Sequence, residues 1–351
     1  MKITEIDRNM LAESNLKFEP VWYDAKDRSK FRLFGLYRPY ERDDYVRMDP
    51  DAAAATSKRV ETLNRHLSGG RLCFTTDAGV VALHARRRDA NIMFNMPWSG
   101  SASFALYVND LYYGAFRSEP GAQEVLYQLS LPEGREKHVT IYFPLYGGAE
   151  EISVGLPEGA AAAPDDPADG RAPILYYGSS ITQGGCASQP GNSYQGMIYR
   201  KNHIDFINLG FSGAAKGEAA MADWLAGMDT SLFVCDFDHN CNKPEDLAAV
   251  HEPLFRKFRA AHPDTPVILM SRTDPPRLHS EAFISSMREV VLSTYRAAKA
   301  AGDENVYFID GAEIFGDAAD LCTIEGCHPN DLGFYHFYKT LAPMIDKLLN
   351  R

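Results

Sequence analysis

Five short apolar segments recur along the second half of the chain, and segments with helical periodicity separate them. The apolar segments are residues 174–178, 204–210, 231–238, 266–271 and 305–310, and the clearest helical patterns are residues 252–261 and 284–301. This alternation is typical of a parallel β-sheet with helices on both faces. In such sheets the ligand site lies outside the carboxyl ends of the strands. The sequence therefore predicts an α/β domain whose site is built from residues that follow the strands.

The first half of the chain has a different pattern. Between about residues 17 and 157 it contains short runs of alternating apolar and polar residues, such as 71–87, 101–117 and 137–145, with hardly any helical periodicity. Asn109-Asp110 fits a hairpin turn between two such runs. Several short strands punctuated by Gly and Pro indicate an all-β sandwich or jelly roll.

A stretch rich in Ala, Pro, Gly and Asp at residues 156–173 separates these two patterns. Such composition is typical of a domain boundary. We therefore predict a β-sandwich domain over residues 1–160 and an α/β domain over residues 161–351.

Polar groups follow three of the predicted strands, and a histidine lies near the C-terminus. Ser180 comes after the first apolar segment, Gly213 after the second and Asn240 after the third, and His328 lies within "TIEGCHPNDLGF". A serine hydroxyl is a poor nucleophile at neutral pH, so it needs a base within hydrogen-bond reach. The tetrahedral oxyanion that its attack creates needs preorganised hydrogen-bond donors.

These residues can meet both needs. Ser180 would attack and His328 would accept its proton. The backbone N–H groups of Ser180 and Gly213 and the side-chain amide of Asn240 would face the oxyanion. Glu325, three residues before His328, would hold the imidazole in the required tautomer.

The order of these motifs resembles that of the SGNH (GDSL-type) hydrolases, whose four blocks place Ser, Gly, Asn and His in this order on a flavodoxin-like sheet. The resemblance extends from residue 174 to residue 349 and rests on "YGSSITQGGCASQPGNSY", "NLGFSG", "FDHN" and "CHPND". It implies that Ser180 is the nucleophile, that Gly213 and Asn240 form the oxyanion hole, and that His328 is the base. The first motif is similar to that of a subgroup with an N-terminal β-sandwich, which resembles carbohydrate acetylesterases.

The sequence departs from the family pattern at two positions. The usual Gly-Asp-Ser is Gly-Ser-Ser here, so Ser179 replaces a residue that mostly helps to fix the turn. The usual Asp-x-x-His is Glu325-x-x-His328, and glutamate is one methylene longer. The sequence therefore leaves open a Ser-His-Glu triad or a Ser-His dyad oriented by a backbone carbonyl.

Four further residues near these motifs allow two interpretations each. Asp238 and His239 precede Asn240 and are candidate substrate-binding residues, although they could equally pack against the end of the sheet. Cys186 and Cys327 flank the predicted site, but neither has a histidine of its own, so we interpret them as small apolar fillers.

Charge and cysteine content exclude several classes of partner. The formal net charge of −11 disfavours nucleic acid and acidic membrane surfaces. The six cysteines include no C-x-x-C pair, which suits free thiols in a reducing compartment. Cys322, Cys327 and His328 lack a second ligand pair at the usual spacing, so we expect no metal and no cofactor. The start of the chain lacks a secretory signal, which predicts a cytoplasmic protein.

These observations predict a serine esterase that removes short acyl groups, with acetyl the favoured one, through an acyl-enzyme. The substrate would be a small-molecule or oligosaccharide acyl ester; the acetyl-sugar part depends on the family resemblance alone. A lipid or thioester acylhydrolase is the second hypothesis, although the residues after Ser180 are polar, unlike an acyl-chain channel. A non-catalytic glycan-binding protein is the third. The sequence does not indicate the oligomeric state.

Overall fold

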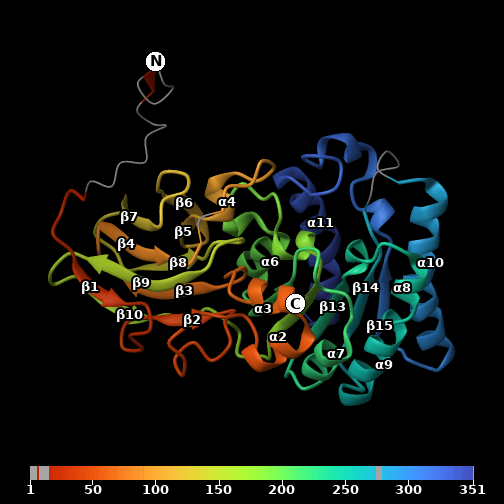
Figure 1. The fold of residues 1–351 in the computed structure, drawn as a ribbon. Helices are drawn as coiled ribbons and strands as arrows, with labels where there is room; N and C mark the ends of the chain where they lie inside the picture. Colours follow the sequence, from red (N-terminus) through yellow and green to blue (C-terminus); the bar gives the residue numbers. More distant parts are fainter. Residues whose placement is uncertain (1–5, 8–15, 90, 274–278, 351) are drawn as a thin grey trace.

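The computed structural model describes residues 6–7, 16–89, 91–273 and 279–350. A β-rich part built from the first half of the chain lies beside an α/β part built from the second half (Figure 1). The prediction on a secretory signal concerns residues 1–20, most of which lie outside the described residues. Within the described ranges, no helix combines the length and apolar character needed to cross a membrane.

The β-rich part consists of two antiparallel sheets. One has the strand order β1-β9-β4-β7 and the other β10-β3-β8-β5-β6, with β2 paired to β3. Apolar side chains from both sheets, such as Phe74, Val81, Ile141 and Val154, fill the core between them. The predicted all-β sandwich is therefore confirmed. Its strands are β1 (Val21–Asp24), β2 (Arg32–Phe34), β3 (Arg71–Thr76), β4 (Val80–Arg87), β5 (Phe104–Val108), β6 (Leu111–Phe116), β7 (Glu124–Ser130), β8 (Lys137–Tyr142), β9 (Ala149–Leu156) and β10 (Ala162–Pro164).

The predicted hairpin turn joins β5 to β6. Asn109 and Asp110 have φ angles of 49° and 63°, and two-residue hairpin loops of type I′ require positive φ at both central positions. The Asn109 side chain also accepts a hydrogen bond of 3.0 Å from the backbone N–H of His138 on β8. This prediction is confirmed.

The first half also contains helices, which the sequence analysis did not predict. Over residues 16–89 and 91–160 they are α2 (Pro50–Thr56), α3 (Lys58–Leu63) and α4 (Trp98–Ser101). Asp49 caps α2 by accepting hydrogen bonds from the N–H groups of Asp51 and Ala52, both at 3.0 Å. Ala53 and Val60 are buried in a core shared with the α/β part. These helices are too short to show a clear period, and their buried faces are matched to elements far along the chain.

The α/β part contains a five-stranded parallel sheet of order β12-β11-β13-β14-β15, which is the flavodoxin-like order. This confirms the predicted fold class. The strands are β11 (Ile174–Gly178), β12 (Phe206–Gly210), β13 (Leu232–Asp236), β14 (Val267–Met270) and β15 (Val306–Ile309). The helices are α5 (Ser180–Gln183), α6 (Tyr194–Asn202), α7 (Ala219–Ala226), α8 (Pro244–Ala248), α9 (His251–Ala261), α10 (Glu281–Ala300) and α11 (Asp331–Leu348).

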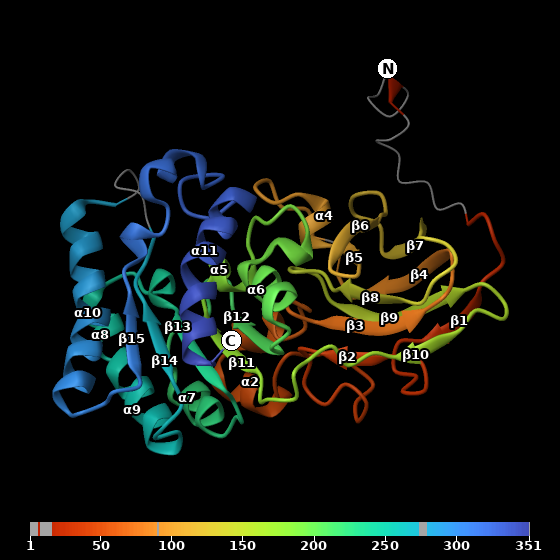
Figure 2. The same ribbon diagram turned by 180° about the vertical axis from the view of Figure 1, so that it is seen from behind.

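Two apolar cores cover the two faces of this sheet. On one face, Ile198 of α6 and Phe337 of α11 are buried with Tyr176 and Val234 of the sheet. On the other face, α7, α9 and α10 contribute a second core of buried side chains. Figure 2 shows the helices and strands from the side opposite to that of Figure 1.

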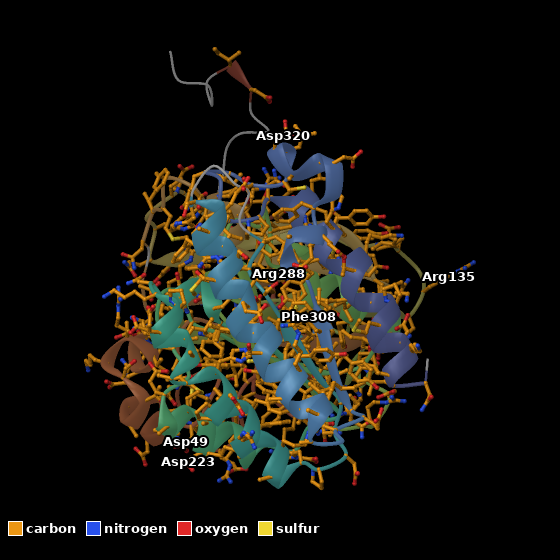
Figure 3. The ribbon with its side chains drawn as sticks, turned by 90° about the vertical axis from the view of Figure 1, so that its right-hand side faces the viewer. Asp49, Arg135, Asp223, Arg288, Phe308 and Asp320 are labelled. Atoms are coloured by element: carbon orange, nitrogen blue, oxygen red, sulfur yellow. The ribbon has the colours of Figure 1, made fainter. Side chains whose placement is uncertain are left out.

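Helix α10 is fixed to the edge strand β15 by a charged side chain. The guanidinium carbon of Arg288 lies 5.7 Å from the ring centroid of Phe308, and the two are neighbours in Figure 3. The Nε of Arg288 also donates a hydrogen bond of 2.7 Å to Asp310, which directly follows β15. The carboxyl end of strand β15 is thereby held against helix α10.

An ion pair joins the sandwich to the α/β part. Arg71 of β3 is fully buried, and its guanidinium lies 4.4 Å from the ring centroid of Tyr199 and 4.0 Å from that of Phe206. It forms an ion pair with Asp205, just before β12. A buried guanidinium needs a counter-charge to offset its loss of hydration.

Replacing Asp205 with asparagine is expected to lower the free energy of unfolding by about 3 to 5 kcal/mol, because it leaves the Arg71 charge buried and unpaired. Chemical denaturation followed by circular dichroism measures this. Glu289→Gln, which breaks the exposed pair with Arg296, is the control and should cost less than about 1 kcal/mol. Equal costs for the two variants would contradict the prediction.

Candidate active site

Ser180 lies where β11 passes into helix α5. Ser179 caps this helix, and its hydroxyl accepts a hydrogen bond of 3.2 Å from the N–H of Ile181. A Cβ added to Gly178 would lie 2.0 Å from Thr182 Oγ1 and 2.3 Å from the carbonyl oxygen of Asp236. Glycine is therefore needed for this close approach, and Ser179 takes over the turn-fixing role of the usual aspartate.

Three of the predicted residues form a continuous chain of contacts. His328 Nε2 lies 2.8 Å from Ser180 Oγ. His328 Nδ1 contacts Glu325 Oε1, and the same carboxylate oxygen accepts a hydrogen bond of 3.2 Å from the backbone N–H of His328. The carboxylate thus faces the ring nitrogen that is turned away from the serine. This is the arrangement in which an acid orients a base and stabilises the imidazolium that forms.

The loop that carries His328 is held by backbone hydrogen bonds. The N–H of Ile324 donates to the carbonyl of His328 at 3.0 Å, and the N–H of Asn330 donates to the carbonyl of Cys322 at 2.9 Å. Asp331, the first residue of α11, accepts a hydrogen bond of 2.8 Å from the N–H of Ser188. The histidine loop and the loop after Ser180 are therefore fixed to each other.

Gly213 and Asn240 also lie together, with their hydrogen-bonding groups occupied. The N–H of Gly213 donates to Asn240 Oδ1 at 3.1 Å, and Asn240 Nδ2 donates to the carbonyls of Phe211 and Ala215, both at 3.0 Å. Gly213 has φ of 63°, and a Cβ added there would lie within 4 Å of nothing, so its backbone conformation rather than crowding favours glycine. Donation to an oxyanion would require these protons to be shared with, or released from, their present acceptors. Their oxyanion role stays a prediction.

Ser180 N–H is the third predicted donor. Ser180 is the first residue of α5, and the first N–H groups of a helix have no acceptor within the helix. Ser180 is buried, with 8% of the residue exposed. A substrate carbonyl at the hydroxyl would therefore approach the amino end of a helix, where negative charge is stabilised.

Asn240→Ala is expected to lower kcat by about 10²-fold with little change in KM, because the amide would act mainly on the transition state. Steady-state kinetics on an activated ester measures the effect. Asn242→Ala, at an exposed position two residues away, is the control and should change kcat by no more than about twofold. A KM increase as large as the kcat loss would instead identify Asn240 as a substrate-positioning residue.

Asp238 and His239 both contact the backbone that follows β14. Asp238 is buried, and its Oδ2 accepts a hydrogen bond of 2.8 Å from the N–H of Arg272. His239 Nε2 accepts one of 3.2 Å from the N–H of Thr273. These contacts join neighbouring strand ends. A role in binding substrate stays a prediction for both residues.

Several residues of the first half of the chain contact the elements that carry the site, and Tyr146 and Arg47 are two that were not predicted. The hydroxyl of Tyr146 donates a hydrogen bond of 3.2 Å to the carbonyl of Ser180. Arg47 Nη1 donates to the carbonyls of Asn208 and Gly210 at 3.0 and 2.7 Å, at the end of β12. Burial lowers the pKa of Arg47 to about 9. No local pattern marks either residue, because both contacts join distant parts of the sequence.

No disulfide joins any of the six cysteines, all of which lie in the described residues. Burial raises the pKa of the Cys186 thiol to about 12, and the nearby Glu325 carboxylate adds to the increase. A thiol with so high a pKa carries almost no thiolate at neutral pH. Cys186 is therefore a poor nucleophile despite its position.

Two sequence families match the chain. The GDSL-like lipase/acylhydrolase family matches residues 171–346, and the family described as the N-terminus of the SGNH hydrolase type of esterase matches residues 20–162. No curated protein matches the chain.

Solved structures share the fold over most of the chain. A protein described as a GDSL-like lipase from Bacteroides ovatus is 26% identical with a TM-score of 0.84, and the match covers 95% of this chain and 98% of that one. A salicylyl-acyltransferase from a tetracycline biosynthetic pathway is 19% identical with a TM-score of 0.78, and the match covers 94% and 97% of the two chains. A family two carbohydrate esterase from Clostridium thermocellum, in complex with cellohexaose, is 15% identical with a TM-score of 0.57, covering 81% and 94%.

Proposed function

Since the chain belongs to the GDSL-like lipase/acylhydrolase family and is an esterase of the SGNH type, we propose that it removes short acyl groups, acetyl first among them, from a carbohydrate or similar polyol. The observation that carries the proposal is the contact of His328 Nε2 with Ser180 Oγ at 2.8 Å, with Glu325 on the other ring nitrogen. A serine and a histidine so placed at the carboxyl end of a parallel sheet can perform acyl transfer.

The proposed reaction has two halves. Ser180 Oγ attacks the ester carbonyl while His328 Nε2 takes its proton, and the Glu325 carboxylate stabilises the imidazolium. The imidazolium then protonates the departing alcohol, which leaves the acyl group on Ser180. In the second half His328 removes a proton from water as the water attacks the acyl-enzyme. The imidazolium then returns that proton to Ser180 Oγ as the bond between Oγ and the acyl carbon breaks, and the carboxylic acid leaves.

Two features support a polar substrate. The segment after Ser180, "TQGGCASQPGNSY", is polar, whereas long acyl chains need an apolar channel. Structures with the same fold include an acetyl xylan esterase from Butyrivibrio proteoclasticus and the carbohydrate esterase in complex with cellohexaose. We therefore propose an oligosaccharide ester over a lipid ester.

The test is a panel of p-nitrophenyl esters of increasing acyl length, followed by acetate release from acetylated oligosaccharides. We expect kcat/KM to be highest for acetate and to fall as the chain lengthens. A rise toward long chains would support a lipid or thioester acylhydrolase instead. Failure to hydrolyse any ester, with the protein folded, would support the non-catalytic glycan-binding alternative.

A further inference from the structure

A third side chain lies beside the Glu325–His328 pair. Cys186, Glu325 and His328 each have one possible ligand atom, and these three atoms lie within 4.8 Å of one another. Among the described residues, this is the cluster of cysteine, histidine and carboxylate side chains that is close enough to hold a metal ion. The thiol that reaches the pair comes from the loop after Ser180, and neither Cys322 nor Cys327 belongs to the group. Thiolate, imidazole and carboxylate are the three protein ligands of zinc.

The backbone holds Cys186 in an unusual conformation. Its φ angle is 89°, in the left-handed region that side chains other than glycine rarely adopt, and the residue is only 4% exposed. The loop before it is fixed, because the N–H of Gly185 donates to the carbonyl of Ser180 at 2.8 Å. Such a conformation persists only where the surroundings impose it. The thiol is therefore held next to the pair by the fold.

The carboxylate has an unused ligand atom. Glu325 Oε1 accepts from His328, whereas Glu325 Oε2 is buried and has no hydrogen-bond partner. A buried carboxylate oxygen without a donor is costly. A cation in this position would satisfy it.

We propose that Cys186, Glu325 and His328 bind a thiophilic divalent cation such as Zn²⁺, and that the bound ion inhibits the esterase. Zinc lies about 2.3 Å from sulfur and about 2.0 to 2.2 Å from nitrogen and oxygen, so ligand atoms already within 4.8 Å of one another need only a small approach. The thiol proton passes to the buffer as the sulfur–metal bond forms, and water takes the fourth position of the tetrahedron.

Inhibition follows whichever ring nitrogen binds the ion. Coordination of Nδ1 removes the contact of His328 with Glu325, and coordination of Nε2 removes the acceptor for the Ser180 proton. The inhibition rests on the proposed function, whereas binding of the ion does not.

Binding is therefore measured directly, by isothermal titration with Zn²⁺ and by the thiolate-to-metal absorption that Co²⁺ shows when a cysteine binds it. We expect one ion per chain and inhibition of p-nitrophenyl acetate hydrolysis that EDTA reverses. Cys186→Gly suits the positive φ, and Cys186→Ala provides a second variant. Each should weaken Zn²⁺ binding by at least about 10-fold and abolish the Co²⁺ absorption, while hydrolysis without metal persists.

Cys327→Ala is the matched control, because Cys327 is adjacent to His328 but outside the trio, and it should bind Zn²⁺ like the wild type. The proposal is overturned if the wild type binds no ion, or if removing the Cys186 thiol leaves the Zn²⁺ affinity unchanged. If binding depends on Cys186 but no ester is hydrolysed, the metal site stands and the proposed function fails.

Discussion

Replacing Ser180 with alanine is expected to lower kcat by about 10⁴-fold or more while the protein stays folded. The hydroxyl lies 2.8 Å from His328 Nε2, and water cannot supply covalent catalysis from the same position. Hydrolysis of p-nitrophenyl acetate, with circular dichroism as a check on folding, measures the loss.

Ser179→Ala is the matched control for this variant. Its hydroxyl accepts the N–H of Ile181 and caps α5, so its removal should cost stability on the order of 1 kcal/mol and leave most of the activity. A serine-directed phosphonate should label Ser180. Labelling of Ser179, or retention of more than about a tenth of the wild-type kcat by Ser180→Ala, would remove Ser180 from the role of nucleophile.

Glu325→Gln should lower kcat by about 10²- to 10⁴-fold and leave KM nearly unchanged. The carboxylate contacts His328 Nδ1, and an amide in its place cannot balance the imidazolium charge and can impose the wrong tautomer. Pre-steady-state release of p-nitrophenol, which reports the attack step alone, measures this most directly.

The control is Glu313→Gln, which neutralises an exposed carboxylate that precedes the same loop. An exposed charge should change kcat by less than about threefold. If Glu325→Gln causes an equally small change, the site is a Ser-His dyad despite the contact. The question left open by the departure from Asp-x-x-His would then be answered in favour of the dyad.

The parallel sheet could be predicted because its strands are buried on both faces and therefore read as continuous apolar runs. Residues 174–178 are an example, since the predicted segment and β11 have the same bounds. The predicted segment 204–210 begins two residues before β12, which starts at Phe206. The Asp205 carbonyl still accepts a hydrogen bond of 2.8 Å from the N–H of Ile174, while its carboxylate pairs with Arg71 of the sandwich.

Contacts between distant segments could not be predicted. The Tyr146 hydroxyl reaches the carbonyl of Ser180, and Ala53 and Val60 of the short helices are buried against the α/β part. The sequence around each of these residues is that of an ordinary loop or surface segment. The partner of each residue is seen only in the folded chain, and for the same reason the sequence did not predict Cys186 as a metal ligand.

The hydrogen bonds of Arg47 also bear on aggregation. Strand β12 is an edge strand, and its outward carbonyls at Asn208 and Gly210 would otherwise offer a template to a strand of another molecule. Here an arginine side chain from the sandwich occupies them, so the edge is closed without a further strand. An α/β part expressed alone would regain this open edge, and we expect it to self-associate through β12.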